Sequence, residues 1–111
     1  MYKRQIQKGD VLIAISSQRI FKEVLDTVKV ANDHELITVA FTDSYTNVLA
    51  SECEYTLAAP VGGLAIDCSH VASLAMLNVL INRIAVSMPD RVIQNLEREN
   101  NKCKDKDLFY I

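Results

Sequence analysis

The sequence predicts an α/β domain with a three-layer parallel sheet, because short apolar runs of strand length alternate with helical patterns. The apolar runs are Val11 to Ile15, Leu36 to Phe41 and Tyr55 to Ala59. Between them lie a helical pattern from Ile20 to Ala31 and a short helical turn from Asn47 to Ser51. The resulting order is βαβαβ, which implies right-handed crossovers and helices on both faces of the sheet.

The first strand stops on two serines. Val11 to Ile15 is continuously apolar, which is consistent with burial on both faces of a parallel sheet, and Ser16 and Ser17 follow it directly. Large apolar side chains then recur at helical spacing, at Phe21, Val24, Leu25 and Val28. The serines have two interpretations that both stay open: they cap the helix, or they contact a ligand where open α/β sheets bind one.

The second strand ends in the polar triplet Thr42, Asp43 and Ser44. This triplet lies at the carboxyl end of the strand next to the first, where a ligand rim and an ordinary turn are equally plausible. The third strand is closed by Pro60.

A long helix follows Gly62 and Gly63. Asp67 or Ser69 can cap this helix, which runs to about Met88. Its surface is apolar except for a narrow polar stripe, which consists of Asn78, Asn82 and Arg83. A helix of this kind must be covered on most sides, so we expect a homo-oligomer, a dimer through the 69–88 helix.

The remaining composition limits the class of protein. The length of 111 residues allows one domain, and the net charge of −2 argues against nucleic-acid binding by this segment itself. Cys53, Cys68 and Cys103 have neither disulfide-like nor CxxC spacing, which favours reduced thiols, and they predict no zinc site. The most hydrophobic segment, from Leu74 to Met88, is too short to span a bilayer. We therefore expect a cytoplasmic protein without a membrane partner.

Four segments carry a resemblance to a known family: GDVLIAIS, KEVLDTVKVA, ITVAFTDS and NVLASECEYTLAAP. The chain resembles the carboxyl-terminal part of a sugar isomerase (SIS) domain, of the type fused to helix-turn-helix regulators of the MurR/RpiR family. The match runs from Gly9 to about Met88. It implies a flavodoxin-like SIS fold that lacks its first strands. We expect a single partial SIS-like domain over residues 1–111, with a core at 9–88 and a C-terminal helix and tail at 89–111.

The resemblance also implies a function and a site. The intact family binds a phosphorylated sugar at the carboxyl strand ends and relays its presence to a DNA-binding domain. Transferred to this chain, that role falls on a strand-end cluster, defined here as Ser16, Ser17, Gln18, Thr42, Asp43 and Ser44. We expect no cofactor and no metal, and DNA contact only through a separate helix-turn-helix domain.

The sugar-phosphate loop departs from the family. The family writes this loop as S-x-S-G-x-T, and the chain has Ser16 to Phe21, where Ser16 alone matches a ligand position. The loop contains no glycine to allow close approach of an anion, and Phe21 replaces a hydroxyl with a bulky ring. This change predicts that sugar-phosphate binding is weakened or lost.

Two other functions stay open beside a sensor without enzyme activity. An aldose–ketose isomerase resembles the same fold but needs a positioned acid and base, and neither His34 nor His70 is spaced with a recognisable partner in the sequence. We therefore expect no catalytic residue. The other alternative is an oligomerisation remnant that binds no sugar.

Overall fold

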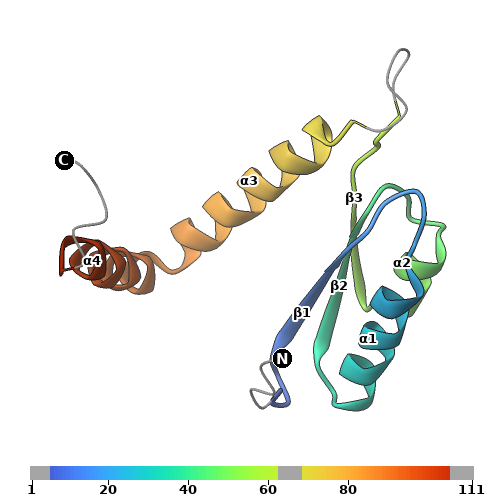
Figure 1. The fold of residues 1–111 in the computed structure, drawn as a ribbon, viewed down its shortest axis with the longest axis horizontal. Helices are drawn as coiled ribbons and strands as arrows, with labels where there is room; N and C mark the ends of the chain where they lie inside the picture. Colours follow the sequence, from blue (N-terminus) through green and yellow to red (C-terminus); the bar gives the residue numbers. More distant parts are fainter. Residues whose placement is uncertain (1–5, 63–68, 106–111) are drawn as a thin grey trace. The chain divides into compact units, whose positions relative to one another are not determined.

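A computed structural model describes residues 6–62 and 69–105, so Asp67 and Cys68 lie outside the described residues. The chain divides into two compact units, Met1–Met76 and Leu77–Ile111. The elements in chain order are β1 (Val11–Ile15), α1 (Lys22–Asp33), β2 (Ile37–Thr42), α2 (Val48–Glu52), β3 (Tyr55–Ala58), α3 (Val71–Ser87) and α4 (Pro89–Asp105) (Figure 1).

The three strands form one parallel sheet in the order β1-β2-β3, which confirms the predicted α/β class. Val11 pairs with Ile37, and Val39 pairs with Tyr55. The strands start within one residue of their predicted positions. Helix α1 starts two residues later than predicted, because the Phe21 carbonyl accepts the N–H groups of both Val24 and Leu25 and Phe21 itself is extended.

Helices α1 and α2 cover one face of the sheet and contact each other (Figure 1). Between them and the sheet lies a small core of buried residues, which consists of Ala14, Val28, Ala40 and Leu49. Alanines in β1 and β2 let the helices approach closely, and the fully buried Val28 and Leu49 fill the space above them. Burial of each of these two larger side chains stabilises the folded chain by about 1.5–3 kcal/mol.

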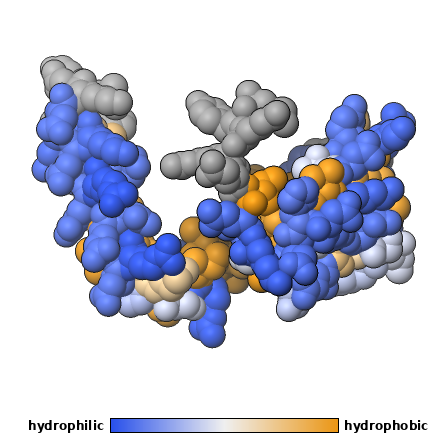
Figure 2. Space-filling view, turned by 90° about the horizontal axis from the view of Figure 1, so that it is seen from below, coloured by the Kyte–Doolittle hydropathy of each residue, from blue (hydrophilic) through white to orange (hydrophobic). Residues whose placement is uncertain are grey.

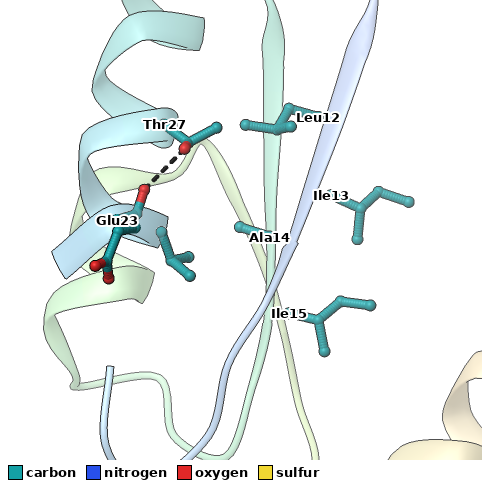
Figure 3. Close-up of a pocket in the computed structure, with 7 residues that line it drawn as sticks. Leu12, Ile13, Ala14, Ile15, Glu23 and Thr27 are labelled. Carbon is teal, nitrogen blue, oxygen red and sulfur yellow. Dashed lines mark hydrogen bonds between the residues drawn. The ribbon is translucent and has the colours of Figure 1, made fainter. Parts of the chain in front are cut away.

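The opposite face of the sheet carries exposed apolar side chains. Val11, Ile13 and Ile15 are 56%, 43% and 61% exposed, so the expected burial of this strand on both faces was wrong. The physical reason is the strand order: it advances in one direction, so right-handed crossovers put α1 and α2 on the same face. In the close-up, Ile13 and Ile15 point away from α1 (Figure 3).

A buried threonine joins three elements of this unit. The Thr38 side chain is fully buried, and its hydroxyl donates to Asn32 Oδ1 at 3.0 Å and accepts the Glu54 N–H at 3.0 Å. Asn32 in turn donates to the Glu52 carbonyl at 2.8 Å. The network thus ties the end of α1 to β2 and to the entry of β3.

Helix α3 begins at Val71, and the Leu74 N–H donates to the His70 carbonyl at 2.9 Å. The helix ends at Ser87, close to the predicted Met88, and Pro89 opens α4 at a position that needs no N–H donor. No side chain of α3 is buried, and Val79 and Ile81 are 68% and 54% exposed. The surface of α4 is largely hydrophilic (blue, at the left of Figure 2).

Within the described residues, no single helix is long and apolar enough to cross a membrane; α3 and α4 reach that length and composition only as a pair, bent by 106°.

Candidate functional site

The strand-end cluster lies at the carboxyl edge of the sheet. Ser16, Ser17 and Gln18 follow β1, Thr42 is the last residue of β2, and Asp43 and Ser44 come next. The Ser16 N–H donates to the Phe41 carbonyl at 3.1 Å, which extends the pairing of the two strands to the edge. The two turns therefore leave the sheet from neighbouring positions, as the sequence predicts.

A hydrogen bond joins the two turns. The Gln18 N–H donates to Asp43 Oδ2 at 3.2 Å. Gln18 has a φ of 60°, a left-handed backbone conformation that costs a residue other than glycine roughly 1–2 kcal/mol. The bond to the Asp43 carboxylate is charge-assisted and helps to offset this cost.

The other carboxylate oxygen of Asp43 faces the start of α2. Its Oδ1 accepts from the Thr42 hydroxyl and from the Asn47 amide, each at 3.2 Å. The Asn47 amide also donates to Thr42 Oγ1 at 2.7 Å, and Asn47 Oδ1 accepts the Ala50 N–H at 2.9 Å as the cap of α2. Thr42 is fully buried within this network. Asp43 thus connects the loop after β1 to the cap of α2.

The serines of the cluster make local contacts. The buried Ser16 hydroxyl donates to the Arg19 carbonyl at 3.5 Å, and the Ser44 hydroxyl pairs with Thr46 Oγ1 at 2.9 Å. The N-cap of α1 is Phe21, with no side-chain hydrogen bond to the helix. The interpretation of Ser16 and Ser17 as caps was therefore wrong, and their contact with a ligand stays a prediction.

The carboxyl edge of the sheet carries both positive and negative groups. The uncapped first turn of α1 places a positive dipole end beside the loop, and Arg19 and Lys22 are exposed cations next to it in the chain. Asp43 contributes a half-buried carboxylate in the same place. The first group attracts an anion, and the second repels one.

Sequence reasoning missed one residue of this network. It places Asn47 in a helical turn without a role at the site, whereas the structure makes Asn47 the donor that holds both Thr42 and Asp43. An asparagine directly before a short apolar helix is an N-cap signal that points to this position.

The two histidines occupy other places. His34 follows α1 at the amino edge of the sheet, and its Nδ1 lies 2.8 Å from the Val30 carbonyl. The six residues of β2 separate that edge from Thr42 by roughly 17 Å. His70 is exposed and precedes α3. Among residues 6–62 and 69–105, no group of three or more histidine, cysteine, aspartate or glutamate side chains is arranged to hold a metal ion.

An open groove of about 280 Å³ lies elsewhere, along β1 and the first turns of α1 (Figure 3). Its lining comes from the four residues Leu12 to Ile15 and from Glu23, Val24 and Thr27. It contains no residue of the strand-end cluster. In the described chain β1 pairs with β2 alone, so the groove follows an unpaired strand edge.

Comparison with known proteins gives three matches. The SIS domain family model matches residues 1–83. The isomerizing glutamine–fructose-6-phosphate aminotransferase of Thermotoga maritima is 37% identical over 83 residues, which are 71% of this chain and 14% of that protein. The sugar isomerase domain of an RpiR transcription factor from Sphaerobacter thermophilus superposes with a TM-score of 0.78 at 26% identity, covering 86% of this chain and 54% of that one. The chain thus spans about half of the solved domain and a small part of the aminotransferase, and the resemblance read from the sequence is confirmed.

Proposed function

Because the chain belongs to the SIS domain family, we propose that it is the sugar-phosphate-sensing part of an RpiR-type transcriptional regulator. The observation that carries this proposal is the likeness to the sugar isomerase domain of an RpiR transcription factor, at a TM-score of 0.78 over 86% of this chain. As a sensor, the domain would act in the cytoplasm, and DNA contact would belong to a separate helix-turn-helix domain.

The proposed ligand site is the strand-end cluster. The hydroxyl groups of Ser16, Ser17 and Ser44 are suited to a sugar or a phosphate, and the uncapped first turn of α1 favours an anion. The loop between β1 and α1 has no glycine, and Asp43 adds negative charge. Binding through this cluster is accordingly weak.

We propose a binding role rather than catalysis. Sugar isomerisation needs a base within hydrogen-bond reach of the substrate, and His34 lies at the opposite edge of the sheet from the cluster. The isomerase alternative is favoured by the 37% identity to the aminotransferase, although that match covers 14% of its length. Incubation of the chain with fructose 6-phosphate in deuterium oxide separates the two: a sensor incorporates no deuterium at carbon, and an isomerase does.

The proposed protein partner is a second copy of this chain. Helix α3 presents apolar side chains on most of its surface, and none of them is buried within the described residues. A soluble protein rarely leaves such a surface open to water. A dimer through the 69–88 helix would bury it.

A thermal-shift screen against a panel of pentose and hexose phosphates tests the sensor. A ligand at 100 times its dissociation constant stabilises the folded state by about 2.7 kcal/mol. We expect at least one sugar phosphate to raise the melting temperature. The matching sugar without phosphate should raise it by a smaller amount. If no member of the panel shifts the transition, the oligomerisation remnant that binds no sugar replaces the sensor.

A further inference from the structure

The Asp43 carboxylate accepts three hydrogen bonds. One oxygen of its carboxylate accepts from Thr42 and Asn47, and the other accepts the N–H of Gln18. Two of these donors lie on the α2 side of the cluster, and the third lies in the loop between β1 and α1. Asp43 therefore does more than form the turn after β2, because it also binds the loop between β1 and α1.

The Gln18 amide is the part of the cluster that an anion would use. Backbone N–H groups in the loop before a helix, together with the helix N-terminus, are the usual donors for phosphate. Helix α1 has no side-chain cap, so its first N–H groups are not bonded to a cap side chain, and the carboxylate in its first turn is that of Glu23. The amide of Gln18, however, is directed at Asp43 Oδ2, 3.2 Å away.

We propose that Asp43 is the specificity-determining residue of the strand-end cluster, since its carboxylate holds the Gln18 amide that a phosphate group would otherwise bind. This inference rests on the proposed function and names how the same site selects its ligand. A phosphorylated sugar binds by displacing the carboxylate from Gln18, and an uncharged sugar binds without that competition. The carboxylate acts as a built-in competitor of phosphate.

The left-handed backbone of Gln18 agrees with this role. A φ of 60° at a glutamine is unfavourable, and it aims the N–H at the turn after β2. The contact joins residues 25 positions apart. Displacement of Asp43 therefore releases the loop as well as the amide, which links ligand binding to a local change of the β1–α1 connection.

The variant Asp43→Asn tests the proposal. Asparagine has nearly the same shape, and it retains an oxygen acceptor while removing the negative charge. We expect its affinity for fructose 6-phosphate and for inorganic phosphate to rise roughly tenfold or more, because a like charge beside the phosphate is gone. Its affinity for fructose should stay within about twofold. Isothermal titration calorimetry of the full chain measures all three ligands.

Asp33→Asn is the matched control. Asp33 is an exposed carboxylate at the last residue of α1, at the other edge of the sheet, so this variant has the same net charge as Asp43→Asn. It should leave all three affinities unchanged. An equal gain in both variants would overturn the proposal, because overall charge would then explain the effect.

The outcomes separate the inference from the proposed function. If both forms bind fructose 6-phosphate equally well, the inference is wrong and the sensor stands. If the Asp43→Asn variant binds fructose 6-phosphate and the wild-type chain does not, the inference stands and the wild-type chain is no phosphate sensor. If neither binds fructose 6-phosphate or phosphate, both ideas fail.

A measurement on the wild-type chain guards against misfolding of the variant. In nuclear magnetic resonance spectra recorded during a fructose 6-phosphate titration, the Gln18 amide and the Asp43 side-chain carboxyl carbon should shift with one common concentration dependence. A ligand that shifts other cluster amides and leaves these two signals in place would contradict displacement.

Discussion

Thr38 is the residue on which the polar interior of the α/β unit depends. Its hydroxyl serves both Asn32 and the Glu54 N–H, and the side chain is fully buried. The variant Thr38→Val keeps the shape and removes both hydrogen bonds, to Asn32 Oδ1 and from the Glu54 N–H. We expect a loss of about 1–3 kcal/mol in the free energy of unfolding, measured by urea denaturation.

The control for Thr38 is Thr27→Val. The Thr27 hydroxyl bonds to the Glu23 carbonyl within α1 on an exposed surface, at 2.7 Å. This change should stay within about 0.5 kcal/mol of wild type. Equal losses in the two variants would mean that the Thr38 network contributes nothing specific.

Cys53 carries the second prediction at this scale. Burial raises the pKa of the Cys53 thiol, Glu52 raises it further, and the hydrogen bond with Thr38 opposes them. The folded chain therefore keeps this proton at a pH where the unfolded chain has begun to lose it. Because of this, the contribution of Cys53 to stability falls as pH rises above the pKa of the unfolded thiol.

The measurement is alkylation with iodoacetamide, followed peptide by peptide in a mass spectrometer. The thiolate is the reactive form, so at pH 8 Cys53 should react more slowly in the folded chain than in the chain unfolded by urea. Equal rates in the two states would contradict the raised pKa.

At the scale of elements, the short helix α2 depends on its cap. Asn47 accepts the Ala50 N–H and also donates to Thr42 and Asp43. Asn47→Ala removes the cap and both donors, and we expect it to destabilise the chain by about 1–2 kcal/mol in urea denaturation. Asn47→Asp keeps a cap oxygen for the Ala50 N–H and loses the donors to Thr42 and Asp43, so comparison of the two variants separates the contribution of the cap from that of the donors. A neutral effect of Asn47→Ala would show that α2 needs no cap.

The elements show why parts of the fold could be predicted. The continuous apolar run from Val11 to Ile15 marks β1 at its observed bounds, although Ala14 is the one residue of the five that is buried. The predicted placement of helices on both faces was wrong for α1 and α2, because the direction of the strand order, which decides the face, is a property of the whole sheet. The bond between Gln18 and Asp43 joins distant positions, and no local pattern encodes it.

For the whole molecule, the central structural expectation is self-association through α3. Leu77→Asp with Ile81→Asp puts two charges on the apolar surface of this helix and should dissociate or unfold the protein. Each leucine-sized side chain buried at an interface contributes roughly 1.5–3 kcal/mol, so a few of them can offset the cost of association. Sedimentation velocity at micromolar concentration measures the outcome.

The matched control lies on the same helix. Asn78→Asp with Asn82→Asp adds the same two charges on the predicted polar stripe and should leave the assembly intact. A folded monomer for the unmodified chain at micromolar concentration would end the expectation of a dimer.

We propose the strand-end cluster as the site where this SIS domain binds a sugar phosphate. Amide chemical-shift mapping with the best sugar phosphate from the thermal-shift panel tests that claim most directly. We predict the largest shifts at Ser16, Ser17, Gln18, Asp43 and Ser44, at the carboxyl ends of β1 and β2. The largest shifts at Gly9 and Glu35, at the amino ends of the same strands, would contradict it.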